Sequence, residues 1–514
     1  MMLPVLLLLA ADYDVLIRNA RILDGSGNPW YRASIGIKAG RIAAIGALPA
    51  ATSDRVIDAA NRIAAPGFID VHTHVEQGIE KVPRGDNYLM DGVTTVVTGN
   101  CGGSKVNLAE WFATLEKTGI GLNLATLIGH NSVRSEVMGT ANRAATPDEI
   151  AKMQALVEKA MTEGAVGFST GLIYIPGTYS NTAEVAALAK VAARHNGVYA
   201  SHMRDEGDKI ADAIQEAVEP GRQAGMPVQI SHFKIDTPRL WGWSVHSLAL
   251  IDKYRREGID VVVDQYPYDH SSTTIAITLP SWALADGQEA IAERLRSPET
   301  RARIAREMEA RLKHLGHPDY SYAILANYPP DRTLEGKNIS QINLLRGREK
   351  SVANEIETIL EFVEKGGRTQ MVYHSMGMED VERIMRYPYT GVASDGGIVE
   401  FGTGMPHPRA YGTNARVLAE FVRNRKTLTL EDAIRRMTSL PARTFSLKDR
   451  GQIREGNAAD ILIFDPEKVQ DKATYQAPHQ FTEGFDYVLV NGVAMVEEGK
   501  LGDRRSGKVL RHQP

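Results

Sequence analysis

The two ends of the chain share one pattern of hydrophobic and polar positions. Within residues 12–63, short runs rich in β-branched residues alternate with turn signals such as Asp24-Gly25 and Ala39-Gly40. The segment 451–500 repeats this texture. Such spacing is typical of antiparallel strands joined by tight turns. We therefore expect residues 12–63 and 415–514 to pair into one small composite β-sandwich.

The middle of the chain, residues 64–414, follows a different rhythm, in which continuous apolar runs alternate with helical patterns. One helix signal combines Thr146 as N-cap, Pro147 in the first turn and Gly164 as the stop. Repeated alternation of buried strands and helices is typical of an α/β fold, the (β/α)8 or TIM-like barrel. The expected strands are FIDVH, TTVVTG, NLATLIG, AVGFST, GVYASH, PVQISH, IDVVVDQY and GVASD. A ninth apolar run, 369–375, is expected to lie outside the ring or to end short of it.

A charged segment interrupts the barrel pattern late in the chain. Residues from about 283 to 350 include ERLRSPETRARIAREMEARLKHLGHPDY, in which charged and apolar positions alternate as on a solvated helix. The segment falls between the seventh and eighth expected strands. It is predicted to be a helical insertion and, because it follows a strand end, a candidate lid over the site.

Composition narrows the class of protein. The chain has 514 residues, 43% of them hydrophobic and 24% charged, with a net charge of −4. It has no basic stripe of the kind that binds nucleic acid, so no nucleic-acid partner is expected. Its one cysteine, Cys101, cannot form an intrachain disulfide.

The N-terminus carries a short apolar run, Leu3 to Ala11. It is shorter than the ~20 residues that a spanning helix needs, and no other run is long enough to cross a membrane. With Ala10 and Ala11 near its end, it resembles the end of a secretory signal, although it lacks a basic start. Residues 1–11 are therefore predicted to be a signal remnant, which implies a periplasmic or secreted protein. A frayed leader on a cytoplasmic protein is the alternative.

Metal-binding residue types stand at the ends of the expected strands. His72 and His74 follow the first strand, and their i, i+2 spacing places both imidazoles on one face. The carboxyl ends of barrel strands meet at one mouth. Four further candidates end other strands and converge there: Cys101, His202, His232 and Asp395. The pattern predicts a divalent metal site.

The chain resembles the amidohydrolase superfamily over nearly its whole length. The motifs that carry the resemblance are APGFIDVHTH (65–74), GVTTVVTGN (92–100), SDGG (394–397) and GNAADILIFDP (456–466). Hydantoinase-like members use a carboxylated lysine on strand four, and here Ser169 stands in that position. GNCGGS (99–104) is similar instead to the D-aminoacylase, or N-acyl-D-amino-acid deacylase, family, in which a strand-two cysteine is a metal ligand. That resemblance implies that Cys101 replaces the lysine.

The resemblance implies a zinc enzyme that hydrolyses the amide of small-molecule N-acyl-D-amino acids. The tight Zn²⁺ site is expected to be Cys101, His202 and His232, since a thiolate with two imidazoles leaves a position for water. His72 and His74 would hold a second, weaker ion or orient the water. We expect a metal-bound hydroxide as the nucleophile, with Asp395 as general base and then general acid.

Other residues are candidates for holding the substrate. Arg409, in HPRAYGT (407–413), can bind the substrate's carboxylate with two hydrogen bonds, and Lys234 shares a face with His232 and can add a second cation. Weaker candidates are Tyr174, Tyr266 and Ser272, in YIPGTYS (174–180) and DQYPYDHSST (264–273).

The loop that follows strand seven predicts which substrate side chains are preferred. Residues 264–282 contain no Arg or Lys but offer apolar and aromatic side chains. Neutral, largely hydrophobic N-acyl-D-amino acids are therefore expected to be preferred over those of D-Glu and D-Asp. The expected wall consists of Tyr266, Tyr268, Ile275, Ile277 and Trp282.

Three alternatives stay open. A dipeptidase that removes a C-terminal D-residue uses the same chemistry. A cyclic amidohydrolase of the hydantoinase type is opposed by Cys101 and by the HPR segment. A non-catalytic scaffold on the same fold would have lost metal ligands, whereas here each ligand position is filled. Zinc content and turnover of N-acetyl-D-methionine would separate these alternatives.

Overall fold

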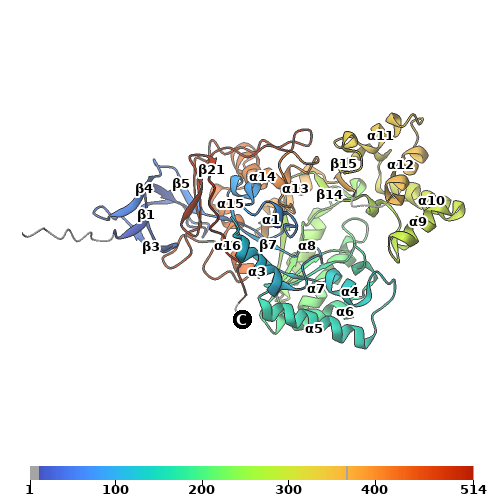
Figure 1. The fold of residues 1–514 in the computed structure, drawn as a ribbon, viewed down its shortest axis with the longest axis horizontal. Helices are drawn as coiled ribbons and strands as arrows, with labels where there is room; N and C mark the ends of the chain where they lie inside the picture. Colours follow the sequence, from blue (N-terminus) through green and yellow to red (C-terminus); the bar gives the residue numbers. More distant parts are fainter. Residues whose placement is uncertain (1–10, 366–368, 513–514) are drawn as a thin grey trace, which may run out of the picture.

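The computed structural model describes residues 11–365 and 369–512. The predicted signal remnant lies outside these residues except for Ala11. Three parts follow one another along the long axis of the molecule: a sheet built from both chain ends, a central barrel, and the unit that contains α9 to α12 (Figure 1). No helix in the described part of the chain is long and apolar enough to span a membrane.

The central part is the predicted parallel barrel. Every neighbouring strand pair recorded within it is parallel, and the ring closes where the Asp395 N–H donates to the His72 carbonyl at 2.8 Å. The strands are β6 (Phe68–Asp70), β7 (Val93–Thr98), β8 (Asn123–Thr126) continued by β9 (Ile128–Gly129), β10 (Gly167–Gly171), β11 (Val198–His202), β12 (Val228–Ile230), β13 (Val261–Gln265) and β17 (Thr390–Val392). They coincide with the expected apolar runs.

Helices surround these strands. The α5 helix begins at the predicted cap, where Thr146 and Glu149 form a reciprocal capping box, and it ends at Gly164 with φ of 113°. Its apolar face is buried through Met153, Val157 and Met161. The other barrel helices are α3 (Leu108–Thr118), α4 (His130–Met138), α6 (Thr182–Ala193), α7 (Ile210–Ala224), α8 (Ser244–Arg256) and α13 (Met378–Arg386), with the short α1 (Gly78–Lys81) and α2 (Asp86–Met90) before β7.

Both chain ends contribute to a nine-stranded sheet. Its halves join where β18 pairs antiparallel with β5, with Leu462 opposite Ala65. The sheet folds over, since the Ile42 N–H at its β3 edge bonds the Asn457 carbonyl just before β18. The strands are β1 (Tyr13–Ile22), β2 (Tyr31–Lys38), β3 (Arg41–Gly46), β4 (Ser53–Asp58), β5 (Ile63–Pro66), β18 (Ile461–Phe464), β19 (Phe485–Val490), β20 (Val493–Glu497) and β21 (Lys500–Leu501).

The C-terminal half of the sheet starts later than residue 415. Between the barrel and β18 the chain forms helices instead, and α15 and α16 pack against β6. The buried residues Ile434, Met437 and Leu440 recur at three-residue spacing, which is helical rather than strand-like. The helices are α14 (Arg409–Arg416), the π-helix Val417–Asn424, α15 (Leu430–Met437) and α16 (Ser439–Thr444).

The insertion between β13 and β17 is larger than 283–350 and is not wholly helical. It contains an antiparallel sheet in the order β14-β16-β15 and has its own apolar core, which includes Ile304, Met308 and Phe362. Its β16 strand is the ninth apolar run, which lies outside the ring. The elements are β14 (His270–Thr274), α9 (Gln288–Arg296), α10 (Pro298–Leu315), β15 (Ala323–Asn327), α11 (Ile339–Leu345), α12 (Val352–Glu364) and β16 (Gln370–His374).

A buried polar network ties the sheet to the barrel. The Asp460 carboxylate accepts from the Asn491 N–H at 2.7 Å and from the Asn123 amide at 3.0 Å, and it also binds the Arg450 guanidinium. Asp460 precedes β18, whereas Asn123 begins barrel strand β8. The side chains of Asp460 and Arg450 are only 6% and 5% exposed.

We predict that Asp460→Ala destabilises the protein by about 3 kcal/mol, because the buried Arg450 charge loses its close partner and the remaining carboxylate, that of Asp449, lies 3.8 Å from Arg450 Nε. Chemical denaturation would measure the change. The matched control is Asp503→Ala, which removes a fully exposed partner of Arg84 and should leave stability nearly unchanged. Equal losses of unfolding free energy in the two variants would show that the buried network does not provide this stabilisation.

Candidate active site

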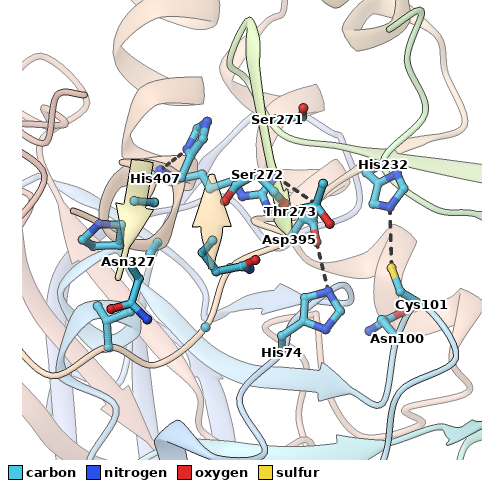
Figure 2. A pocket seen from close by; sticks show the side chains of 18 of the residues that line it. His74, Asn100, Cys101, His232, Ser271, Ser272, Thr273, Asn327, Asp395 and His407 are labelled. Carbon is cyan, nitrogen blue, oxygen red and sulfur yellow. Dashed lines mark hydrogen bonds and ion pairs between the residues drawn. The ribbon is translucent and has the colours of Figure 1, made fainter. Parts of the chain in front are cut away.

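The predicted metal-binding residues meet in one cavity at the carboxyl ends of the barrel strands. The cavity has a volume of about 660 Å³ and is lined by His74, Cys101, His202, His232 and Asp395, among others. Figure 2 shows His74, Cys101, His232 and Asp395 pointing toward one another from different strand ends. His72 lies beneath them and is fully buried.

Cys101 is the centre of the cluster. Its Sγ lies 3.5 Å from His202 Nδ1, 3.5 Å from His232 Nε2 and 3.3 Å from His72 Nε2. The two nitrogens of His202 and His232 are themselves only 2.6 Å apart. Three imidazoles and the cysteine therefore present their donor atoms to one point.

The donor set fits zinc. With bonds of about 2.3 Å to sulfur and about 2.0 Å to nitrogen, a tetrahedral ion places sulfur and nitrogen roughly 3.5 Å apart. The distances from Cys101 Sγ to the His202 and His232 nitrogens match that value. The two nitrogens, 2.6 Å apart, would have to separate to about 3.4 Å. Three protein donors leave the fourth position open, as in catalytic rather than structural zinc sites.

A second group of donors shares the cysteine. His72, His74, Cys101 and Asp395 each offer one ligand atom, and these atoms all lie within 4.8 Å of one another. Asp395 Oδ1 is 3.1 Å from His74 Nε2 and 3.4 Å from His72 Nε2. The site therefore has room for two ions, with Cys101 between them.

Charge keeps the reactive groups ionised. Burial alone would raise the pKa of the Cys101 thiol, but the charges of His72 and His232 and a hydrogen bond with His202 hold it well below its usual range. A thiolate is the form that binds zinc. Burial would likewise raise the pKa of Asp395, yet Arg409 in particular keeps it well below its usual range. Asp395 is therefore free to accept a proton.

The backbone is bent to present these side chains. Cys101, His232 and Asp395 adopt left-handed φ values of 52°, 35° and 50°. Residues other than glycine are costly there, and such conformations concentrate at functional sites. Ser169, which stands where the lysine of hydantoinase-like members is expected, accepts from the Gly102 N–H and donates to the Gly99 carbonyl. Ser169 thus pins the loop that carries the thiolate.

Two buried acids orient the imidazoles. Asp264 Oδ2 lies 3.2 Å from His72 Nδ1, and its other oxygen accepts from the His232 N–H at 2.8 Å. Glu206 Oε1 lies 3.1 Å from His232 Nδ1. Carboxylates behind ligating imidazoles fix the tautomer and strengthen the ligand. Sequence reasoning missed both acids, although Asp264 opens the quoted segment DQYPYDHSST and Glu206 lies four residues after His202.

Lys234 has a buried acidic partner that the sequence pattern does not predict. Its Nζ is 2.7 Å from Glu206 Oε1 and 2.7 Å from His232 Nδ1, and the residue is buried. Burial raises the pKa of the Glu206 carboxyl, but Lys234 and His232 lower it to about 2. Lys234 thus neutralises a buried acid behind the imidazole, and it also lines the cavity, so its role toward a substrate carboxylate stays a prediction.

Arg409 lines the cavity. Its Nη1 is 2.8 Å from Asp395 Oδ2, a close ion pair without the alignment of a hydrogen bond. Its Nη2 donates to the Ser272 carbonyl at 3.3 Å, and its guanidinium stacks on the Tyr266 ring at 4.6 Å. The stacked, ion-paired guanidinium is held in a fixed plane at the cavity wall.

The three weaker substrate-binding candidates, Tyr174, Tyr266 and Ser272, have different surroundings in the structure. Tyr174 lines the cavity, lies against His202 with ring centroids 4.7 Å apart, and bonds Thr273 through its hydroxyl. The Tyr266 ring lies under the Arg409 guanidinium, and its buried hydroxyl has no hydrogen-bond partner in the described chain. Ser272 differs from expectation, because its hydroxyl is used in donating to the β16 carbonyl of Met371 and only its backbone carbonyl faces Arg409.

Comparison with known proteins decides the family. A model of the amidohydrolase family matches residues 55–496. The chain belongs to the amidohydrolase family. An N-acyl-D-glutamate deacylase of Alcaligenes xylosoxydans xylosoxydans is 34% identical over 97% of this chain and 96% of its own.

Two solved members of the family have the same fold as this amidohydrolase. One is an N-acyl-D-glutamate deacylase from Bordetella bronchiseptica in complex with zinc and a phosphonate that mimics the tetrahedral intermediate; it is 33% identical, with a TM-score of 0.82, and covers 97% of this chain and 99% of its own. The other is a D-aminoacylase whose binuclear centre is described as activated by one metal and attenuated by a second. It is 30% identical, with a TM-score of 0.82, over 97% of this chain and 100% of its own.

We predict that Cys101→Ala removes both the tightly bound metal and the activity of this amidohydrolase, because Cys101 belongs to both donor groups. Wild-type protein should retain about one zinc per chain after desalting. Metal analysis checks this, with circular dichroism to confirm folding. Full zinc occupancy in the variant would overturn the assignment of Cys101 as a ligand.

Proposed function

We propose that this protein is a zinc-dependent N-acyl-D-amino-acid deacylase, which hydrolyses the amide to a carboxylate and a free D-amino acid. The observation that carries the proposal is the thiolate-centred donor cluster beside an ionised Asp395 and a fixed Arg409. The D-aminoacylase and N-acyl-D-glutamate deacylase relatives, which align over nearly the whole chain, support the same chemistry.

When bound, zinc would polarise the amide carbonyl and lower the pKa of a coordinated water to about 7. Cys101, His202 and His232 are the residues that would hold it, with His72 and His74 available for a second ion. Glu206 and Asp264 keep the imidazoles in position from behind.

Asp395 carries the proton. Its carboxylate is ionised and faces the donor cluster, so it can accept the proton of the attacking water and then protonate the departing nitrogen. Arg409 binds the carboxylate that the product amino acid bears beside its amine, using N–H groups that Asp395 does not fully occupy. This contact fixes the distance between the scissile amide and Asp395.

We predict that Asp395→Asn binds substrate but turns over at least ~100-fold more slowly, since a positioned general acid–base is typically worth that much. The asparagine keeps the shape of the side chain but cannot carry the proton. Steady-state kinetics with N-acetyl-D-methionine, at matched zinc content, checks this. Near-wild-type kcat would remove Asp395 from the mechanism.

The cavity favours a neutral D-side chain. Beyond the donor cluster it is lined by Ile173, Ile277, Ile398 and Val399. Of the expected wall, Tyr266 and Ile277 line it, whereas Trp282 turns away to bond Glu307. No arginine of residues 283–350, a fully described stretch, lines the cavity. The cations that do are Lys234 and Arg409, already paired with acids, and the exposed Lys81.

We predict a kcat/KM for N-acetyl-D-Leu and -Met at least ~10-fold above that for N-acetyl-D-Glu and -Asp, because an acidic side chain would lose solvation without gaining a dedicated cation. The L-enantiomers serve as controls. Preference for the acidic pair would point to Lys81, and loss of that preference in Lys81→Met would confirm it. Faster cleavage of dipeptides that end in a D-residue would favour the dipeptidase alternative.

A further inference from the structure

A second cluster of metal-binding side chains lies away from the catalytic donors, where the insertion leaves the barrel. Asp269, His270 and His374 each offer one ligand atom, and these atoms lie within 4.8 Å of one another. We propose that these three residues form a separate site for a divalent transition-metal ion, which joins the two ends of the insertion. The proposal does not depend on the proposed function.

The strand register brings the two imidazoles together. His270 begins β14 and His374 ends β16, and the two residues are directly opposite in the antiparallel pair. Directly opposed side chains lie on the same face of a sheet, and here the ring centroids are 4.7 Å apart. Two histidines 104 positions apart in sequence therefore present nitrogens to one point.

The third donor is held toward the same point. Asp269 Oδ1 is 2.7 Å from His270 Nδ1 and accepts from the Tyr475 hydroxyl at 2.9 Å. A hydrogen bond of this kind orients a ligating carboxylate. The Asp269 backbone carbonyl accepts from the Met376 N–H at 3.0 Å, which anchors it to the end of β16.

One distance in the cluster is longer than a hydrogen bond, as expected for two ligands that an ion would separate. His374 Nε2 is 3.9 Å from Asp269 Oδ2, too far for a hydrogen bond. Ligands of a tetrahedral ion with bonds of about 2.0–2.2 Å lie roughly 3.4 Å apart, so small side-chain shifts would close the site. The His374 side chain is 45% exposed, which gives an ion access. Two imidazoles with one carboxylate suit Zn²⁺, Ni²⁺ or Cu²⁺ rather than Mg²⁺ or Ca²⁺.

The site is linked to the catalytic centre through the backbone. The His270 carbonyl accepts from His407 Nε2 at 3.0 Å, and His407 Nδ1 accepts from the Arg409 N–H at 3.0 Å. The next residue of β14, Ser271, lines the catalytic cavity. An ion at the junction would therefore fix both the base of the insertion and the wall beside Arg409.

The test is calorimetric titration of Ni²⁺ into desalted, zinc-loaded enzyme. The wild type should bind one more ion per chain than His374→Ala does; any weaker position in the catalytic centre is present in both proteins and cancels. Loss of a direct ligand should weaken binding at least ~10-fold. The matched control is His317→Ala, in the same insertion, whose ring stacks on Tyr322 instead.

A second variant tests whether a loss of binding in His374→Ala is caused by misfolding. Asp269→Asn keeps an acceptor for Tyr475 but loses the charge, and should also weaken the additional ion. Catalytic zinc and kcat before Ni²⁺ addition should match the wild type in both variants. The proposal is overturned if the wild type binds no more Ni²⁺ than His374→Ala, or if His317→Ala loses the ion equally.

Discussion

The rest of the site depends on the convergence of one thiolate and several imidazoles on a single point. A thiolate lies about 3.5 Å from two imidazole nitrogens that are themselves 2.6 Å apart, in a place where most of the surroundings are buried. Without a metal ion, imidazole protons can hold the cluster together, through hydrogen bonds with the thiolate and between His202 and His232. With one, the same crowding becomes a ligand sphere. The barrel strands, the bent backbone and the supporting acids all serve to hold the donors in this arrangement.

The backbone conformation and the residues behind the ligands both hold the donors in place. Left-handed backbone at Cys101, His232 and Asp395 turns each side chain inward at the point where its strand ends. Behind the ligands, Glu206 fixes the far side of one imidazole and is itself neutralised by Lys234. Lys234 therefore supports the metal-binding imidazole from behind, and Arg409 is the residue that we propose binds the substrate carboxylate.

Much of this arrangement is readable from the sequence, for a physical reason. A strand that is buried on both faces must be a continuous apolar run, so the barrel strands and the polar residues at their ends are visible without coordinates. The replacement of a lysine by Ser169, with Cys101 nearby, likewise needs only residue identity. The partners of Lys234 and Ser272 are different, because they depend on which loops meet in space.

The extent of the insertion also depends on tertiary contacts that the sequence pattern does not reveal. Its first strand, His270–Thr274, is polar and only half-buried, so no apolar period reveals it, and the charged helices alone suggested a shorter, helical segment. The helices α15 and α16 after β17 lie within residues 415–514, which the strand pattern of 451–500 predicts to belong to the sheet as a whole. Short polar strands and domain boundaries are set by tertiary pairing, which the local pattern does not encode.

The most direct measurement is zinc K-edge X-ray absorption of the protein loaded with one zinc per chain. The account predicts one sulfur ligand at about 2.3 Å together with nitrogen or oxygen ligands at about 2.0–2.1 Å. A ligand sphere of nitrogen and oxygen alone would contradict it, because Cys101, the only cysteine in the chain, would then not be a ligand.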